Sequence, residues 1–277
     1  MPDIRNHSLY AVNTYSYTLR ETAPDCVRKL AAQGFREFEL MMYPGHLWPQ
    51  HMDGAARASF RDYLRGEGLS IRTINMPNVD LNIAAATVEM REMTLGQLRR
   101  FIALAGDLGA GGIVLGPGKA NPLLPMATSA MTDYFHAALR ELVPLAQQCG
   151  TSVLIENMPF AFLPRIEELL AAMDQFGDQG IGVVYDLANG HFIREDIAMA
   201  IRRIGSRLKV LHVSDTSHAV YRHDAVGLGT VDFSVVPAAL REIGFSGRPV
   251  LEIIDLDPDV SIPRSVQSLC AMGWGAA

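Results

Sequence analysis

The chain has 277 residues, of which 49% are hydrophobic, and its formal net charge is -6 at pH 7. A chain of this length and composition can bury one large core, so we expect a single domain over residues 1–277. The acidic balance gives no electrostatic reason to expect nucleic acid as a partner, because non-specific binding to polyanions depends on Lys and Arg. We expect a small-molecule substrate instead, and assembly into a homo-oligomer stays open.

The three cysteines, Cys26, Cys149 and Cys270, lie far apart in the sequence and form no CxxC pair. This usage fits free thiols in a reducing compartment and argues against a cysteine zinc site. The first residues contain no apolar signal core, and no later segment offers a long uninterrupted apolar span. We therefore expect a cytoplasmic protein that does not enter a membrane.

Apolar runs of strand length alternate with amphipathic segments of helix length along the whole chain. In chain order, the expected strands cover residues 8–13, 35–41, 69–75, 111–116, 152–157, 181–186, 208–214 and 249–254. The expected helices cover residues 22–33, 54–65, 87–108, 128–148, 164–175, 194–204, 234–243 and 260–272. Because the strands are continuous apolar runs, both faces of the sheet should be covered, which favours a parallel α/β barrel, the (β/α)8 TIM barrel, over an open doubly wound sheet.

Four of these strands end in a residue type that binds metal ions. Their sequences are Leu154-Ile155-Glu156, Val184-Tyr185-Asp186, Val210-Leu211-His212 and Val250-Leu251-Glu252. Each candidate ligand follows an apolar residue by two positions, so an apolar layer and the ligands would share one face of the strands. In TIM barrels the chemistry lies at the carboxyl ends of the strands, where Glu39 also ends a strand. We expect these side chains to meet at the barrel mouth.

This set of ligands suits one divalent ion, Mn²⁺, Mg²⁺, Co²⁺ or Zn²⁺, and does not choose among the four. Four protein ligands leave room for a substrate that binds through two neighbouring oxygens, and an ion there would polarise a carbonyl. A carboxylate within reach could then remove the proton from the adjacent carbon and give an enediolate. Glu156 and Glu252 lie three strands apart, so they could flank such a substrate from opposite sides.

The motifs around these positions resemble the xylose-isomerase-like barrel superfamily, which includes sugar phosphate isomerases and epimerases, ketose 3-epimerases, hydroxypyruvate isomerase and the endonuclease IV nucleases. They are Ile155-Glu156-Asn157, Tyr185-Asp186 with His191 following, Leu211-His212-Val213-Ser214-Asp215, Gly227-Leu228-Gly229-Thr230-Val231-Asp232 and Leu251-Glu252. The resemblance implies that Glu156, Asp186, His212 and Glu252 bind one divalent metal ion. It also implies that Glu156 and Glu252 are the catalytic acid/base pair.

The chain departs from this pattern in the substrate-binding positions. Ketose epimerases of the superfamily carry a histidine three residues after the aspartate ligand, where this chain has Asn189, and the histidine comes at His191. They often carry an arginine six residues after the histidine ligand, where this chain has His218, with Arg222 and His223 nearby. The full set of candidate substrate-binding residues is Glu39, Trp48, Asn189, His191, His218, Arg222 and His223.

The leading hypothesis is a metal-dependent isomerase or epimerase of a small sugar or hydroxy-keto acid. A metal-dependent lyase or dehydratase would begin with the same proton abstraction and then expel a hydroxyl group. A nuclease like endonuclease IV is disfavoured, because no histidine follows strands three and four, where the chain has Asn75-Met76 and Gly116-Pro117-Gly118. A catalytically inert barrel that serves as a binding subunit is the fourth hypothesis, and it predicts a protein without a bound ion.

Overall fold

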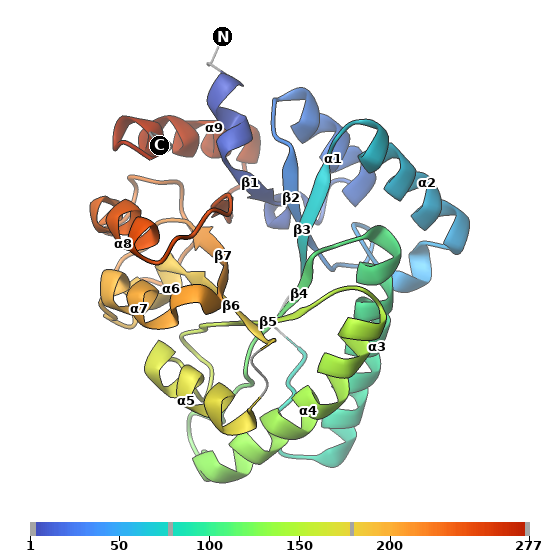
Figure 1. Cartoon of the computed structure of the whole chain (residues 1–277), viewed down its shortest axis with the longest axis vertical. Helices are drawn as coiled ribbons and strands as arrows, with labels where there is room; N and C mark the ends of the chain where they lie inside the picture. The colour runs from blue at the N-terminus through green and yellow to red at the C-terminus, as the bar shows by residue number, and fades with distance from the viewer. Residues whose placement is uncertain (1–3, 77–79, 178–179, 275–277) are drawn as a thin grey trace.

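The computed structural model describes residues 4–76, 80–177 and 180–274. Its eight parallel strands are hydrogen-bonded in chain order, and the first strand pairs with the last, so the barrel is closed (Figure 1). The predicted (β/α)8 barrel is confirmed. The strands are β1 Ala11–Asn13, β2 Glu37–Met41, β3 Ser70–Asn75, β4 Gly112–Leu115, β5 Val153–Glu156, β6 Gly182–Asp186, β7 Leu208–Val213 and β8 Val250–Leu251.

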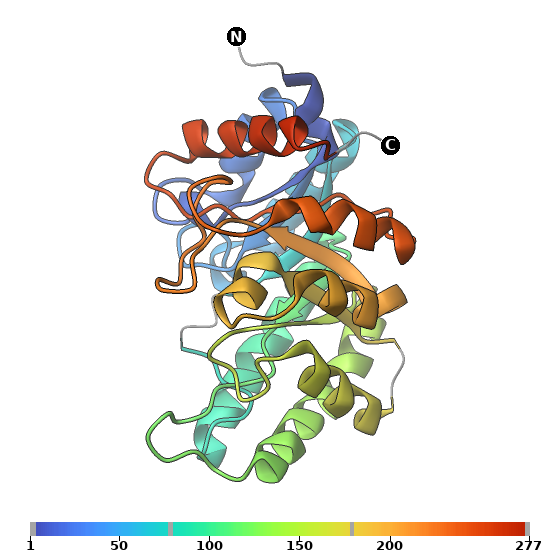
Figure 2. The same ribbon diagram turned by 90° about the vertical axis from the view of Figure 1, so that its left-hand side faces the viewer.

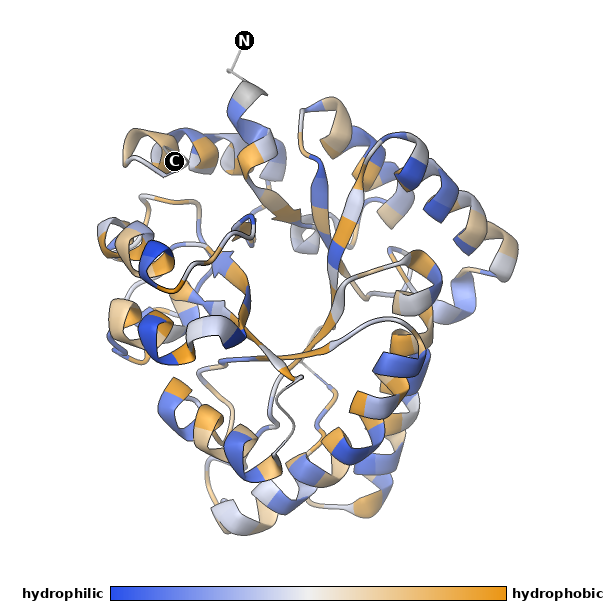
Figure 3. Cartoon of the chain, in the orientation of Figure 1, coloured by the Kyte–Doolittle hydropathy of each residue, from blue (hydrophilic) through white to orange (hydrophobic). Residues whose placement is uncertain are grey.

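Helices surround the barrel on its outside, as Figure 1 and Figure 2 show from two directions. They are α1 Ala23–Ala32, α2 Gly54–Gly66, α3 Val88–Leu108, α4 Thr128–Gln148, α5 Ile166–Phe176, α6 Leu187–Phe192, α7 Ile197–Ile204, α8 Val236–Glu242 and α9 Pro258–Ala271. Apolar and polar residues alternate along the outer helices (Figure 3), which is typical of helices that bury one face. Within the described residues, no helix has the length and apolar character needed to span a bilayer.

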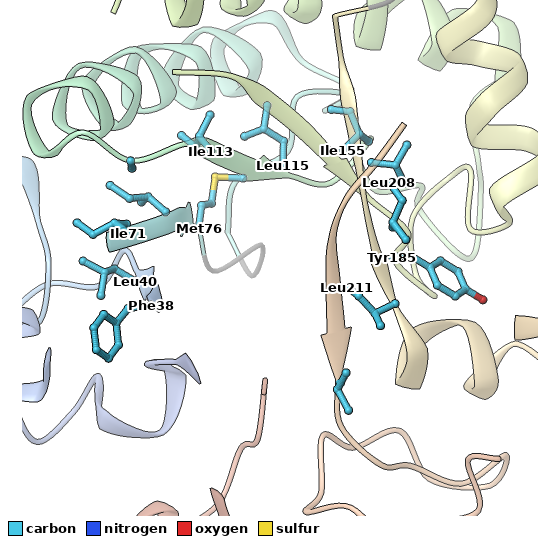
Figure 4. Packing of buried hydrophobic residues seen from close by; sticks show 14 of the residues in the cluster. Phe38, Leu40, Ile71, Met76, Ile113, Leu115, Ile155, Tyr185, Leu208 and Leu211 are labelled. Carbon is cyan, nitrogen blue, oxygen red and sulfur yellow. The ribbon is translucent and has the colours of Figure 1, made fainter. Parts of the chain in front are cut away.

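The apolar core forms two layers, one on each side of the strands. The larger layer lies between the strands and the helices, and Figure 4 shows part of it, including Phe38, Ile113 and Leu211. The smaller layer fills the inside of the barrel and consists of Ala11, Val114, Leu154, Val184, Val210 and Val250. Because side chains alternate along a strand, the residue two positions after each member of the inner layer points to the same interior.

The largest differences from the predicted element boundaries concern β1, α7 and β8. Residues 8 and 9 belong to a 3-10 helix, Ile4–Leu9, so β1 is shorter than expected. The helix expected over 194–204 begins three residues later, at Ile197, because Arg194 adopts a left-handed conformation, with φ of 60°; a separate short helix that the sequence did not predict, α6, precedes it. Asp196 then begins α7 by accepting a hydrogen bond from the Met199 amide. The third difference is β8, which ends at Leu251, so Glu252 lies just beyond the strand.

Candidate metal centre and active site at the barrel mouth

The four predicted ligands converge directly above the inner apolar layer. Glu156, Asp186, His212 and Glu252 are all buried, and one ligand atom of each lies within 4.8 Å of those of the others. They follow the inner-layer residues of the same segments by two positions, as strand alternation requires. The structure therefore brings together the four side chains that the sequence pattern had placed on one face.

His212 occupies the centre of the cluster, and its two ring nitrogens face different neighbours. Its Nδ1 lies 2.9 Å from Glu156 Oε1, 3.1 Å from Glu252 Oε2 and 3.8 Å from Asp186 Oδ2. Its Nε2 lies 2.9 Å from Glu39 Oε1. When Nε2 carries the proton and donates it to Glu39, the Nδ1 lone pair points toward the other three carboxylates. The geometry thus selects Nδ1 as the atom available to a metal ion.

Two buried carboxylate oxygens in this cluster have no hydrogen-bond donor among the described residues, and they test whether a cation fits. Asp186 Oδ1 accepts from the Asn189 amide at 2.6 Å and Glu252 Oε1 accepts from Asn13 Nδ2 at 3.2 Å, whereas Asp186 Oδ2 and Glu252 Oε2 accept none. Leaving such oxygens without a partner is costly in a buried site. A divalent cation bound by these oxygens and by His212 would remove that cost, so the residues fit a metal ion.

The pKa values in the cluster show the same need for positive charge. Burial, reinforced by the charge of Glu252, raises the pKa of Asp186 to about 7, although His223 and His212 oppose the change. Burial also raises the pKa of Glu156, against the opposing effect of His212. Burial lowers the pKa of His212, but the surrounding carboxylates, Glu39 first among them, raise it well above its ordinary value. In the absence of a cation, protons supply the missing positive charge.

Glu39, a candidate substrate contact, lies beneath the cluster and does not line the cavity. Besides His212, it accepts hydrogen bonds from Asn13 Nδ2 at 2.6 Å, Thr73 Oγ1 at 2.5 Å and Asn75 Nδ2 at 3.1 Å. Burial alone would raise the pKa of Glu39, but the charge of His212 and the hydrogen bonds from His212, Thr73 and Asn75 lower it, so the carboxylate is held ionised. Glu39 is therefore positioned to fix the orientation of the His212 ring.

A cavity of about 450 Å³ opens above the four candidate metal ligands. Glu156 and Glu252 line it, whereas Asp186 and His212 are not among its lining residues. Much of the wall is apolar and consists of Met41, Met76, Leu81, Ile83, Met158, Pro159, Phe160 and Ile254. This volume falls within the range of pockets that enclose small molecules.

Only two of the seven candidate substrate-binding residues line this cavity, namely Asn189 and His223. Trp48 instead packs against the core, where its ring meets Phe101 edge to face at 5.3 Å. Arg222 is exposed on the loop that follows β7. The structure thus separates residues that the sequence had grouped together.

His191 and His218 pack against each other away from the cavity wall. Their rings stack with centroids 4.0 Å apart, and His218 Nδ1 lies 2.9 Å from the His191 carbonyl oxygen. His191 Nε2 also lies 2.8 Å from Thr230 Oγ1. The pair therefore joins α6 to the loop after β7, and neither ring is among the lining residues.

The sequence prediction missed Tyr221, which completes a hydrogen-bonded chain along the cavity wall. Its hydroxyl donates to Asn189 Oδ1 at 2.7 Å and lies 2.9 Å from His223 Nε2. The Nδ1 atom of His223 lies 3.0 Å from Ser214 Oγ and 3.5 Å from Glu252 Oε2. Alternation along an extended segment could have indicated Tyr221, because residues 221 and 223 then share one side and Arg222 faces the other.

Asp215 holds the loop that carries Tyr221 and His223. Its carboxylate accepts hydrogen bonds from the backbone amides of Thr216 at 2.9 Å, Gly227 at 2.9 Å and Val231 at 3.0 Å. Its own backbone pairs with Asp224 through two hydrogen bonds of 2.8 Å. The Gly227 amide is thereby used within the loop, where it helps to hold the turn at residues 227–229.

Comparisons with known proteins agree with this fold. The chain is 24% identical over 237 residues to an uncharacterized protein of Methanocaldococcus jannaschii, covering 83% of this chain and 78% of the relative. It is 23% identical over 164 residues to an L-ribulose-5-phosphate 3-epimerase of Escherichia coli, covering 59% of this chain and 57% of that relative. The crystal structure of a D-tagatose 3-epimerase-like protein superposes with a TM-score of 0.80 at 21% identity, covering 95% of this chain and 96% of the other. The xylose isomerase-like TIM barrel family model matches residues 27–272, and the chain belongs to this family.

Proposed function

We propose that this protein is a divalent-metal-dependent isomerase or epimerase that acts on a small sugar or hydroxy-keto acid. The observation that carries the proposal is the pair of buried, donor-free oxygens, Asp186 Oδ2 and Glu252 Oε2, gathered around His212 at the base of a ligand-sized cavity. The epimerase names of the relatives support the same class of reaction. Neither the geometry of the site nor the names of the relatives identify the substrate.

Glu156, Asp186, Glu252 and Nδ1 of His212 would hold the ion. When bound, it would supply the positive charge that polarises a substrate carbonyl and acidifies the neighbouring C–H bond. Asp186 and His212 are closed off from the cavity, so their role is confined to binding the ion. Glu156 and Glu252 are different, because both also face the space that a substrate would occupy.

Glu156 and Glu252 are therefore the proposed acid/base pair. One carboxylate removes the proton from the carbon next to the carbonyl, and the electron pair of that C–H bond moves to the carbonyl oxygen to give an enediolate. Return of a proton to the opposite face of the same carbon gives an epimer. Return to the former carbonyl carbon, with transfer of the proton of the other hydroxyl to the former carbonyl oxygen, gives an isomer.

Asn189, Tyr221 and His223 are the proposed substrate-binding residues. Because the Tyr221 hydroxyl donates to Asn189, its oxygen accepts from Nε2 of His223, and this fixes the proton of the imidazole on Nε2. Nδ1 of His223 is then an acceptor that Ser214 Oγ meets at 3.0 Å, and a substrate hydroxyl would bind there by taking the place of the Ser214 hydroxyl. These three hydrogen-bonded residues would bind the substrate in place of the histidine and the arginine that ketose epimerases of the superfamily carry at the positions of Asn189 and His218.

The test is to incubate the metal-loaded protein with ketoses, aldoses and hydroxy-keto acids in D₂O and to follow deuterium entering the product carbon. Glu156→Gln and Glu252→Gln should each abolish exchange while circular dichroism shows an intact fold. Glu195→Gln is the matched control, because Glu195 is a half-buried carboxylate outside the cavity that accepts hydrogen bonds from the Tyr185 hydroxyl and the Ile166 amide. Exchange that persists in either cavity variant would remove that residue from the acid/base role, and a product that has lost water would favour the dehydratase.

A further inference from the structure

Lys119 is a cationic residue in the cavity wall that the acid/base chemistry does not use. It lies in the loop after β4, and the described lining residues include no other lysine or arginine. In the closed strand order β4 lies four strands from β8, so the loop that carries Lys119 and the segment that carries Glu252 reach the mouth from opposite sides of the barrel. Both residues line the cavity, so a molecule that fills it would lie between an acidic residue on one side and a basic residue on the other.

The backbone of Lys119 is held in place by the two neighbouring loops. Asn82, in the loop before α3, accepts from the Lys119 amide at 2.9 Å and donates to the Lys119 carbonyl at 3.1 Å. On the other side, Lys119 forms an antiparallel bridge with Ala161, and the Phe162 amide donates to the Gly118 carbonyl at 3.0 Å. The lysine therefore starts from a fixed position, which reduces the entropy lost when its side chain binds a ligand.

Gly118 shows how closely these loops are packed. Its φ of 118° lies in the region that favours glycine, and a Cβ atom at this position would lie 2.5 Å from Cβ of Ala84. A larger residue would push the loop that carries Lys119 away from the loop that carries Asn82. The close packing of these two loops therefore requires glycine at position 118.

The surroundings of Lys119 make its charge more effective than that of a fully exposed lysine. The residue is half-buried, and the cavity wall contains the apolar side chains of Met76, Leu81 and Ile83. Burial lowers the pKa of Lys119, partly offset by the charge of Asp80, so its ammonium group is partly desolvated. A charge-assisted hydrogen bond is stronger where water is partly excluded.

We propose that Lys119 binds an anionic group of the substrate, a carboxylate or a phosphate, on the side of the cavity opposite Glu252. The substrate class would then be acidic or phosphorylated sugars, or short hydroxy-keto acids, and not neutral sugars. This inference rests on the proposed function only in taking the cavity as the substrate site.

Three ketohexoses that differ only at C6 test the inference: D-fructose, D-fructuronate and D-fructose 6-phosphate. Inorganic phosphate and malonate serve as probes that need no turnover. The variants are Lys119→Met, which keeps much of the side-chain length without the charge, and Lys119→Arg, which keeps the charge. Lys209→Met is the matched control, because Lys209 is an exposed lysine on β7 that donates to the Ser206 carbonyl.

Calorimetric titration of the metal-loaded full-length chain should show binding of at least one anionic compound. Lys119→Met should weaken that binding at least tenfold, Lys119→Arg should retain most of it, and Lys209→Met should leave it unchanged. Binding of D-fructose should change less than threefold in all variants. Preference for the phosphorylated over the carboxylated compounds, or the reverse, identifies which anion the site takes.

Anion binding that is equally tight in wild type and Lys119→Met would overturn the inference, as would absence of anion binding. If neutral ketoses exchange deuterium and Lys119→Met has no selective effect, the anion site fails and the proposed function stands. If anions bind through Lys119 but no compound exchanges deuterium, the proposed function fails and the anion site stands.

Discussion

Glu39→Gln is expected to weaken metal binding although Glu39 itself is not a ligand. Glu39 Oε1 accepts from Asn13 and Asn75, and Oε2 accepts from Thr73; His212 Nε2 lies 2.9 Å from Oε1 and 3.1 Å from Oε2. An amide keeps one acceptor oxygen and replaces the other by an NH₂ group. In either orientation of the amide, its NH₂ group faces side chains that donate hydrogen bonds to Glu39 in the wild type. Each donor left without an acceptor should lower the free energy of unfolding by about 1–3 kcal/mol.

The orientation of that amide sets the loss of metal affinity. If NH₂ faces His212, Nε2 must become the acceptor and the ring proton moves to Nδ1, which faces Glu156 and Glu252 and would no longer offer a lone pair. If the amide oxygen faces His212, the tautomer survives but the charged partner is lost. Replacing the carboxylate that supports a metal-binding histidine typically lowers affinity about 10–100-fold, and we expect a loss in this range.

The assay is competition between the protein and a chelating indicator for Co²⁺, Zn²⁺ or Mn²⁺, combined with urea unfolding of the metal-free protein. Glu37→Gln is the matched control, because Glu37 lies two residues earlier on β2, is buried and pairs with Arg72 at 2.9 Å. This control should lose stability while keeping its metal affinity. Wild-type affinity in Glu39→Gln, or an equal loss of affinity in Glu37→Gln, would refute the reasoning.

Four further predictions concern the charge, the core and the loop of the site. The affinity for a divalent ion should rise with pH up to about 7, because a proton on Asp186 competes with the ion, and titrations at several pH values measure this. The folded state holds the Asp186 proton more tightly than the unfolded state does. The free energy of unfolding of the metal-free protein should therefore fall as pH rises from 3.8, the ordinary pKa of Asp, through about 7. A flat profile would contradict both trends. Leu154→Ala should lower the free energy of unfolding by about 2–5 kcal/mol in urea titrations, because it opens a cavity in the inner layer. Asp215→Ala should expose residues 216–230 to limited proteolysis, because three loop amides lose their acceptor; an unchanged cleavage pattern would show that the loop is held otherwise.

The barrel and the cluster of candidate metal ligands could be predicted from the sequence because both depend on local periodicity. In a strand the side chain two positions on always points to the same face, so Leu154 with Glu156 and Val184 with Asp186 fix their own geometry. The choice of loop residues could not be predicted in this way. The course of the loop after β7 depends on the backbone pairing of Asp215 with Asp224, which no local sequence pattern indicates. This pairing turns Tyr221 and His223 inward and leaves Arg222 exposed.

The sequence pattern also cannot separate the ligands from the residues that support them. Asn13, Glu39 and Asn75 lie at or near the ends of β1, β2 and β3 and are as buried and polar as the ligands at the ends of β5 and β6. The difference lies in their partners. Glu39 has four donors around it, so both oxygens are satisfied by protein, whereas Asp186 and Glu252 each keep one oxygen free. Glu39 and its partners thus position the imidazole of His212, whereas Asp186 and Glu252 offer the free carboxylate oxygens. Only the hydrogen bonds seen in three dimensions distinguish these two roles among the acidic residues at the strand ends.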